Sequence, residues 1–390
     1  MTKIEKYKES VYACARCGTC RSKYDYFDHV ARVCPVGEHS PGFEPYFSRG
    51  RVAVAQEILE GRTKYSPALA EVLTWCTTCK NCEEKCGATD ATGDSKIKTT
   101  KITEAMRADI VDLGMAPEAY KRISSRIEKD RNPYSEPKEE RAKWAKKLGV
   151  PNKADIMYFV GCTSAYRRPE IAKATAKILK AAGVKFGITS DEWCCGSPLF
   201  RTGFEKLAED MAKHNVEVFK GAKTLVTACA GCAKTIINDY PKIVGDLPFQ
   251  VMHISEFLET LKDEGKLKLK KPIKKKVTYH DPCHMGRELG LYEPPRNVLT
   301  AIPGIELNEM VQNRTNAWCC GGGGGFKISN PEAAVEIAGD RLKHAKEVGA
   351  KAIVSTCPFC KTNILDAIKA KGSNLEFYDL TELIAKSMGL

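Results

Sequence analysis

Two kinds of pattern account for all 18 cysteines of this 390-residue chain. Near the N-terminus lie two groups of four, namely Cys14, Cys17, Cys20, Cys34 and Cys76, Cys79, Cys82, Cys86. Further along, a single cysteine, a Cys-Cys-Gly and a Cys-x-x-Cys follow one another twice, as Cys162, Cys194, Cys195, Cys229, Cys232 and as Cys283, Cys319, Cys320, Cys357, Cys360. Thiolates at this density and spacing indicate several metal clusters, so the fold must bring distant segments together. We therefore expect an electron-transfer protein.

The composition and the distribution of apolar residues indicate the size of the protein and the cellular compartment in which we expect it. The chain is 43% hydrophobic and 28% charged, which suits two or three globular domains. The N-terminal MTKIEKYKESVYA lacks the apolar run of a signal peptide, and no stretch approaches the roughly 20 apolar residues of a membrane span. We expect a cytoplasmic protein with no membrane span of its own, so that any attachment to the inner face of the membrane runs through a partner. Reduced thiols in that compartment favour metal ligation over disulfides.

The charge balance is basic, with a net charge of +12 and seven lysines between Lys266 and Lys276. These lysines fit a solvated linker, and the basic balance also fits an anionic substrate or an acidic partner. The chain has no helix-turn-helix or zinc-finger spacing and no interleaved aromatic and basic residues, so we expect no nucleic-acid binding.

The pattern of apolar residues changes along the chain. Residues 1–115 contain two expected helices, at 52–61 and 66–76, and the second begins with the helix-starting pair Ser-Pro. Residues 116–154 are highly charged and suggest a linker with an exposed helix. From residue 155 short apolar runs alternate with helical patterns, which predicts parallel sheets.

This α/β part is an internal duplication. The expected order in the first half is strand 156–162, helix 169–183, strand 184–189, helix 205–221, strand 224–232 and a closing segment 249–261. The second half repeats it with strand 276–283, a helix fragment 297–302, helix 331–349, strand 352–360 and a closing segment 375–385. Matching cysteines are offset by 121, 125 and 128 residues. We expect two domains, 155–272 and 273–390, of the same fold.

The N-terminal cysteines have ferredoxin spacing. In two-cluster ferredoxins three cysteines of a run bind one cluster and the fourth binds the other. This rule gives one cubane [4Fe–4S] cluster to Cys14, Cys17, Cys20 and Cys86, and a second to Cys76, Cys79, Cys82 and Cys34. The first run is unusual because 13 residues separate Cys20 from Cys34. Either these residues are an insertion or Cys34 is spare. Zinc also suits Cys-x-x-Cys, but two interleaved runs favour iron–sulfur clusters.

The duplicated motifs place cysteines after successive strands, near the edge where open α/β sheets gather ligands. Five thiolates exceed the four that a cubane needs, which suggests a larger or irregular cluster.

Both motifs resemble the CCG domain of the heterodisulfide reductase superfamily, through His280-Asp281-Pro282-Cys283-His284 and Cys319-Cys320 with Gly321–Gly325. The eight-cysteine module is similar to the helical ferredoxin module of the same superfamily. The resemblance covers about 350 of the 390 residues and corresponds to the fused form, in which both modules occur in one chain. It implies an α+α/β fold, with a helical two-cluster ferredoxin module before two duplicated α/β CCG domains. It also implies a noncubane [4Fe–4S] cluster in each complete motif.

The resemblance implies an oxidoreductase acting on a sulfur group, which reduces the coenzyme M–coenzyme B disulfide with electrons passed inward from the cubane clusters. One alternative is an electron-transfer subunit of a lactate or glycolate oxidase-like dehydrogenase, although relatives of that kind have one degenerate motif. Another is a reductase for a different disulfide or trisulfide. No G-x-G-x-x-G follows a strand, so electrons must come from a partner, either a membrane cytochrome b or a soluble flavoprotein.

Several residues near the clusters are candidates for chemistry. His280 and His284 flank Cys283 and could deliver protons or instead hydrogen-bond to cluster sulfurs. Arg287 and Lys327 could bind an anionic substrate group, although they could equally be surface charges. Gly321–Gly325 lacks the Gly-Lys-Ser/Thr of a nucleotide loop and suits a close backbone approach to a cluster or substrate.

Overall fold

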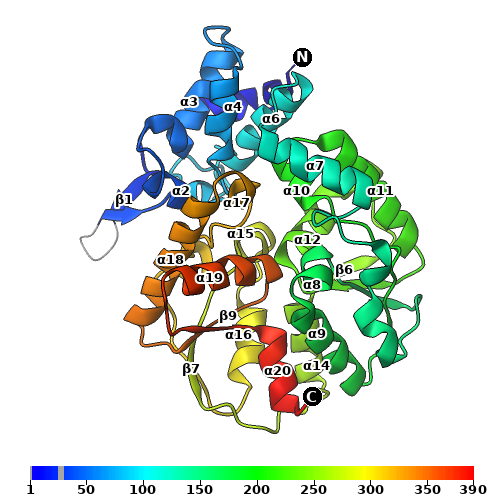
Figure 1. The fold of residues 1–390 in the computed structure, drawn as a ribbon. Helices are drawn as coiled ribbons and strands as arrows, with labels where there is room; N and C mark the ends of the chain where they lie inside the picture. The colour runs from blue at the N-terminus through cyan, green and yellow to red at the C-terminus, as the bar shows by residue number, and fades with distance from the viewer. Residues whose placement is uncertain (1, 25–29) are drawn as a thin grey trace.

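The computed structural model describes residues 2–24 and 30–390. A helical module formed by the N-terminal segment lies against two α/β domains (Figure 1). The first α/β domain is drawn in green and the second in yellow to red, and the two lie side by side below the helical module. The expected fold class, a helical ferredoxin module followed by two duplicated α/β domains, is confirmed.

The helical module, called the ferredoxin module below, is built mainly from short helices. Its elements are η1 (Lys3–Tyr7), α1 (Lys8–Tyr12), β1 (Ser22–Tyr24), β2 (Val30–Arg32), α2 (Pro35–Glu38), η2 (Glu44–Tyr46), α3 (Ser48–Leu59), α4 (Pro67–Thr74), α5 (Asn81–Glu84) and α6 (Thr99–Asp112). The expected cap of α4 is present, because the Ser66 hydroxyl accepts a hydrogen bond from the Leu69 N–H at 3.2 Å. Strands β1 and β2 pair antiparallel, so the chain after Cys20 doubles back toward Cys34.

Three helices follow in the charged segment, namely α7 (Glu118–Asp130), η3 (Lys138–Glu140) and η4 (Lys143–Leu148). The expectation of an exposed helix here is wrong for one face of α7, because Tyr120, Ser124 and Ile127 are buried. Their spacing of three to four residues places them on one side of the helix, and α7 contacts both α/β domains.

The two α/β domains have the same strand order. The first contains β3 (Ile156–Phe159), α8 (Cys162–Tyr166), α9 (Pro169–Ala181), β4 (Phe186–Gly187), α10 (Ser197–Thr202), α11 (Glu205–Phe219), β5 (Thr224–Thr227), α12 (Ala230–Lys234), η5 (Thr235–Asp239), α13 (Pro241–Val244), β6 (Gln250–His253) and α14 (Ile254–Asp263). The second contains β7 (Lys275–Tyr279), α15 (Cys283–Leu289), α16 (Glu293–Thr300), β8 (Ile305–Leu307), η6 (Arg314–Asn316), α17 (Phe326–Ser329), α18 (Pro331–Glu347), β9 (Ala352–Ser355), α19 (Pro358–Ala370), β10 (Glu376–Asp379) and α20 (Leu380–Met388).

All strand pairs in these sheets are parallel, in the orders β4-β3-β5-β6 and β8-β7-β9-β10. The register sets Ile156 opposite Phe186 and Thr224 in the first sheet, and Val277 opposite Leu307 and Ala352 in the second. The strand expected over 184–189 contains only Phe186 and Gly187, because only these two residues pair with β3 at the edge of the sheet.

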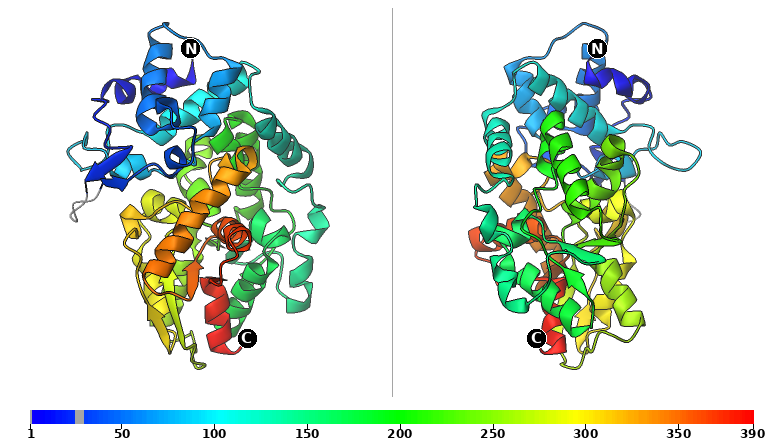
Figure 2. Two further views of the ribbon diagram at one scale, coloured as in Figure 1. Left: turned by 60° about the vertical axis from the view of Figure 1, so that its left-hand side comes forward. Right: turned by 90° about the vertical axis from the view of Figure 1, so that its right-hand side faces the viewer.

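The interface between the α/β domains is nearly symmetric. Helix α9 packs on α20 as α16 packs on α14, and α8 meets α19 as α15 meets α12. In both views of Figure 2 the C-terminal helix α20, in red, lies beside the green first domain. One apolar core continues across the interface and includes Tyr158 and Ile171 of the first domain with Tyr279 and Ile384 of the second. The domain boundaries near residues 115, 154 and 272 stay predictions, and each falls between two elements.

Candidate metal centres and a shared cavity

Cys34 lies with the second ferredoxin run. Burial is the main reason that the pKa of its thiol is raised, and charges on Cys76 and Cys79 raise this pKa further. Gly37 donates its backbone N–H to the Cys34 sulfur at 3.4 Å, and Arg51 is buried beside the same thiols. The β1–β2 hairpin explains how Cys34 reaches this position despite the long spacing, which favours the interpretation of an insertion.

The other ferredoxin group lies nearer the surface. Cys14, Cys20 and Cys86 are partly buried and Cys17 is exposed, whereas Cys76 and Cys79 are buried. The hydroxyl of Thr19 lies 3.3 Å from the Cys17 sulfur, and this contact is the main reason that the pKa of the Cys17 thiol is lowered. A cluster on these cysteines would therefore be the one that a redox partner can approach.

Two cysteines of each α/β domain follow the carboxyl ends of parallel strands. Cys162 begins α8 just after β3, and Cys283 begins α15 just after β7. Cys229 and Cys357 stand immediately before α12 and α19, after β5 and β9. The strand-end rule thus predicts this convergence, because carboxyl ends of parallel strands share one edge.

One cavity of about 450 Å³ joins the two sets of cysteines. Nine of the ten lie in its wall, namely Cys162, Cys194, Cys195, Cys229, Cys232, Cys283, Cys320, Cys357 and Cys360. Cys229 of the first domain contacts Cys357 of the second across the domain boundary. A hydrogen bond from Cys229 is the main reason that the pKa of the Cys357 thiol lies well below its usual value. The two motifs therefore face each other over one shared space.

The tenth cysteine, Cys319, faces the ferredoxin module. A hydrogen bond to Cys319, together with burial, raises the pKa of the Cys79 thiol well above its usual value. The backbone of the glycine loop 321–325 packs closely here, since a Cβ on Gly324 would lie 2.5 Å from the carbonyl carbon of Thr77. The second ferredoxin run and the second CCG motif are thus in direct contact.

A buried ion pair that sequence reasoning missed lies beside the first motif. Arg141, from the charged segment, donates to Glu192 Oε1 at 2.6 Å and to the Cys162 sulfur at 3.4 Å. Glu192 also accepts the N–H groups of Val160 and Gly161 at 2.7 and 2.9 Å. Arg141 lies 21 positions before Cys162, in a charged run that is typical of a solvated linker. The sequence therefore did not indicate that Arg141 contacts Cys162.

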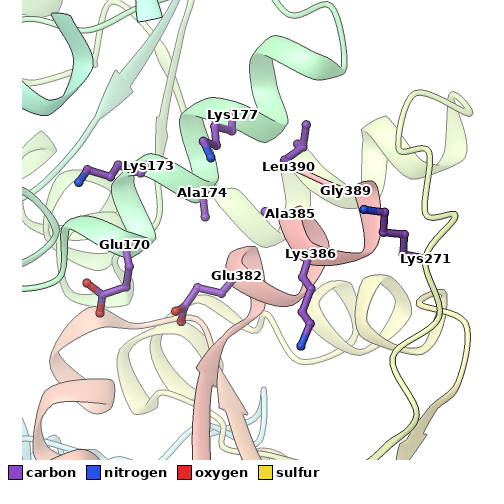
Figure 3. Close-up of a pocket in the computed structure, with 10 residues that line it drawn as sticks. All are labelled: Glu170, Lys173, Ala174, Lys177, Lys271, Glu382, Ala385, Lys386, Gly389 and Leu390. Atoms are coloured by element: carbon purple, nitrogen blue, oxygen red, sulfur yellow. The ribbon is translucent and has the colours of Figure 1, made fainter. Parts of the chain in front are cut away.

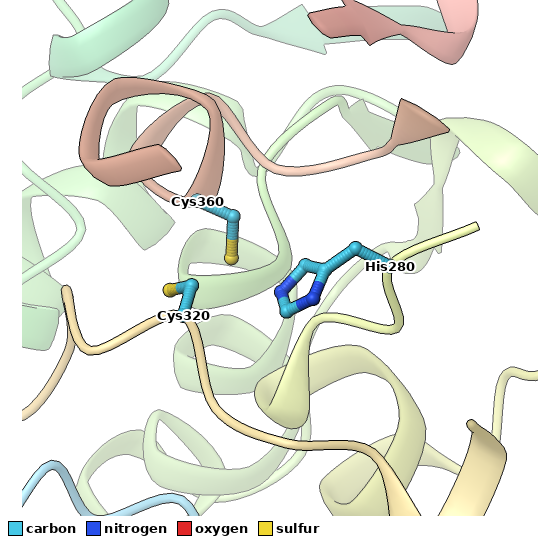
Figure 4. A group of neighbouring side chains, drawn as sticks. All are labelled: His280, Cys320 and Cys360. Atoms are coloured by element: carbon cyan, nitrogen blue, oxygen red, sulfur yellow. The ribbon is translucent and has the colours of Figure 1, made fainter. Parts of the chain in front are cut away.

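The two predicted catalytic histidines are buried and differ in position. His280 has a ring nitrogen within 4.8 Å of the sulfurs of Cys320 and Cys360 (Figure 4). His284 lies in the cavity wall, and its Nε2 has no hydrogen-bond partner among the described residues. Burial lowers the pKa of His280 to about 3 and that of His284 to about 4, and nearby arginine or lysine charges contribute. Proton delivery by either residue stays a prediction.

The two predicted substrate-binding residues make hydrogen bonds within the protein. Arg287 donates its Nε to the Cys79 carbonyl at 2.6 Å and its Nη1 to the Ala317 carbonyl at 2.7 Å. Lys327 donates to Asn363 Oδ1 and Asp366 Oδ2, both at 2.6 Å. Neither is among the described residues that line the cavity, so their role in substrate binding stays a prediction without geometric support.

The thiols fit iron–sulfur clusters by their chemistry. All 18 are free of disulfides, and most are buried. Backbone N–H groups point at several of the sulfurs, including Thr78 to Cys76 at 3.4 Å, Gly321 to Cys319 at 3.3 Å and Gly322 to Cys320 at 3.4 Å. Such donors stabilise thiolates and tune cluster potentials.

A second cavity, of about 470 Å³, contains none of the cysteines (Figure 3). It opens between α9 and α20 near the C-terminus, beside Lys173, Lys177, Lys271 and Lys386. One of the seven clustered linker lysines, Lys271, belongs to this group.

Two cysteine-rich α/β domains behind a dicluster ferredoxin module define an iron–sulfur protein of the CCG class. The family described as a cysteine-rich domain (CCG) matches residues 156–237 and 277–365, and a 4Fe-4S dicluster domain matches residues 10–89. The chain belongs to the heterodisulfide reductase superfamily of CCG-domain proteins.

Curated relatives support this membership. The chain is 37% identical to one component of the dihydromethanophenazine:CoB–CoM heterodisulfide reductase of Methanosarcina barkeri, over 97% of this chain and 94% of the relative. It is 30% identical to one component of the fumarate reductase (CoM/CoB) of Methanothermobacter marburgensis, over 98% of this chain and 74% of the relative. A hypothetical protein from Helicobacter pylori shares the fold, with a TM-score of 0.61 at 11% identity over 92% of this chain and 71% of that one.

The predicted superfamily and the predicted enzyme class, a heterodisulfide reductase-like oxidoreductase with iron–sulfur clusters, are thereby confirmed. Within the part of the chain that the structure describes, no helix is long and apolar enough to cross a membrane.

Proposed function

We propose that the chain is the catalytic iron–sulfur component of a heterodisulfide reductase and reduces the disulfide of coenzyme M and coenzyme B. The names of the relatives supply this substrate. In this proposal two cubane [4Fe–4S] clusters occupy the ferredoxin module, and one noncubane [4Fe–4S] cluster occupies each CCG domain. The ligands are the cysteine groups predicted from the spacing.

The single observation that carries the proposal is the shared cavity. Sulfurs of both motifs line it from opposite domains, so a disulfide inside would have a set of cysteines on each side. Clusters on these cysteines would fill part of the space, and the part beside Ile123, Ile328 and Phe359, where no cysteine lies on α7 or α17, would receive the substrate. Both motifs retain all five cysteines, which also favours chemistry at both.

Reduction of the disulfide takes two electrons and two protons, and it breaks one S–S bond to give two thiols. When bound, the clusters supply the electrons one at a time. The chain itself supplies the binding space and a hydrogen-bond donor or acceptor, since His284 lies in the wall with Nε2 unpartnered among the described residues. Ile123, Ile328 and Phe359 give this wall an apolar part that excludes water.

The electron donor in this proposal is a soluble flavoprotein or a membrane cytochrome b. It would approach the cysteine group that includes the exposed Cys17. Electrons would then pass to the second CCG motif where Cys79 contacts Cys319.

Anaerobic turnover tests the proposal. Protein with about 16 irons, the content of four [4Fe–4S] clusters, is mixed with a reduced viologen dye and the coenzyme M–coenzyme B disulfide. We expect thiol release at enzymatic rates and a matching oxidation of the dye. Absence of turnover at full iron content would refute this substrate and favour an electron relay or a reductase for another sulfur compound.

A further inference from the structure

The wall of the shared cavity is unusual in its charge. Its described residues include three arginines, Arg122, Arg126 and Arg201, and no aspartate or glutamate, although the chain contains 49 acidic residues. Carboxylates that would repel a bound anion are thus absent from the described part of the wall. Apart from the cysteine thiolates, which the clusters would take up, the charged side chains described there are arginines, which are hydrogen-bond donors.

Two of these arginines come from one face of α7. Ala119, Arg122, Ile123 and Arg126 all line the cavity, and their spacing of three, four and seven residues places them in one stripe. The adjoining face of α7 carries Tyr120 and Ile127, which are buried and hold the helix in place. The stripe is therefore a fixed part of the cavity wall.

Arg122 and Arg126 are both exposed, and neither forms an ion pair or side-chain hydrogen bond with any described residue. Unpaired arginines one helical turn apart repel each other modestly, so their juxtaposition has a cost that an anion between them would remove. Both guanidinium groups are free to bind a phosphate or sulfonate through two parallel hydrogen bonds.

The third arginine lies deeper. Arg201 is 2% exposed, and its terminal nitrogens donate to Glu104 Oε1 at 2.6 Å and to Asp239. Its Nε has no partner among the described residues. Two carboxylates hold this guanidinium in place, so it gives the cavity wall a hydrogen-bond donor in a fixed position.

We propose that Arg122 and Arg126 of α7 bind the anionic end of the disulfide, a phosphate or sulfonate, and so select anionic over neutral disulfides. This inference rests on the proposed function. The charged end stays at the rim beside α7, while the rest of the molecule extends past Ile123 and Phe359 toward the cysteines and Arg201. The segment that links the ferredoxin module to the first α/β domain is thereby part of the substrate site.

The test compares two double variants of the iron-loaded protein. Arg122→Gln with Arg126→Gln removes both charges from the cavity stripe. Lys121→Gln with Lys129→Gln removes the same charge from exposed positions of α7 outside the cavity wall, and serves as the matched control. Binding of the coenzyme M–coenzyme B disulfide is measured anaerobically by calorimetry without reductant, and turnover with reduced viologen is measured in parallel.

For the arginine variant we expect Kd and KM to rise on the order of tenfold or more, with kcat within roughly twofold of the parent. The lysine variant and the parent should agree. A neutral hydroxyalkyl disulfide should show no difference among the three proteins. Competition by inorganic phosphate and by methanesulfonate then distinguishes which anionic group the arginines hold.

The two proposals fail separately. Absence of turnover in the parent refutes the proposed function, yet a selective loss of disulfide binding in the arginine variant would still support the anion site. Equal Kd values in the arginine and lysine variants refute the anion site even if turnover is fast. A parent protein that does not bind the anionic disulfide refutes the anion site as well.

Discussion

At the scale of single residues, the two duplicated domains use different side chains for the same structural role. His253 and Asp379 each precede the closing helix of their domain and cap it, with Glu256 and Glu382 completing both capping boxes. The His253 ring contacts Ser255 Oγ and the Thr356 carbonyl, which fits a structural role. Asp379 has one oxygen, Oδ2, without a partner among the described residues, and burial raises its pKa to about 7.

The raised pKa of Asp379 predicts a pH dependence of stability. Between the ordinary aspartate pKa of about 4 and its folded value of about 7, the folded state holds a proton that the unfolded state releases. Stability should therefore fall as the pH rises through this window. Asp379→Asn keeps the capping oxygen and cannot ionise. The thermal unfolding midpoint of this variant should therefore decrease less than that of the parent as the pH rises through this window. The exposed Asp246→Asn is the control, and equal pH profiles for both variants would contradict the prediction.

At the scale of elements, the glycine loop 321–325 joins the second CCG motif to the ferredoxin module. Gly321, Gly324 and Gly325 have positive φ angles of 80°, 64° and 74°, which favour glycine. A Cβ on Gly324 would also lie 2.7 Å from the Cys76 carbonyl oxygen. The loop therefore allows a close approach between two backbones, as the sequence suggested, and one of them belongs to the ferredoxin ligand loop.

Gly324→Ala should disturb this contact. We expect it to lower the free energy of unfolding by about 3 kcal/mol, since the clash adds to the cost of a positive φ. Gly349→Ala is the matched control, because Gly349 has a φ of 69° and nothing within 4 Å of the added Cβ. Its loss should be about 1 kcal/mol. Thermal unfolding and the electron paramagnetic resonance signal of the ferredoxin clusters provide the measurements, and equal losses would show that no close approach exists.

At the scale of the whole molecule, one buried side chain connects all three units. Arg107 of α6 donates to the carbonyls of Leu73 and Cys76 in the ferredoxin module, Arg201 in the first α/β domain and Gly324 in the second. Its guanidinium also lies over the Tyr120 ring at 5.6 Å. This guanidinium therefore helps to fix the relative positions of the cysteine groups.

Arg107→Met should loosen this junction. Four buried carbonyls would lose their donor, and we expect a loss of about 3–5 kcal/mol in the free energy of unfolding. In the proposed function, electron transfer from clusters of the ferredoxin module to clusters of the CCG domains should also slow, which rapid-freeze spectroscopy after mixing with reductant can follow. Arg62→Met, on the surface of the same module, should change neither quantity appreciably. Unaltered transfer in the Arg107 variant would show that the units hold their positions without it.

The fold follows from the sequence to a large extent because apolar runs, glycines and cysteines repeat in one order. The strand-end rule also predicts that both CCG motifs converge. Contacts between residues that are far apart in the sequence cannot be predicted in this way. Arg287 lies near Cys283 in the sequence, which suggests a substrate role, yet its hydrogen bonds go to backbone carbonyls. Arg122 and Arg126 give no sequence signal because a charged helix resembles a linker, and only the cavity distinguishes its two faces.

The continuous core across the two α/β domains has a consequence for how such a chain could have arisen. A single half, produced alone, would expose the apolar faces that α9 and α14 now bury against α20 and α16. Two copies of that half could cover these faces by pairing around a twofold axis, in the isologous manner of homodimers. The present chain then corresponds to a fused homodimer whose two halves have since diverged, each with its own contacts to the ferredoxin module.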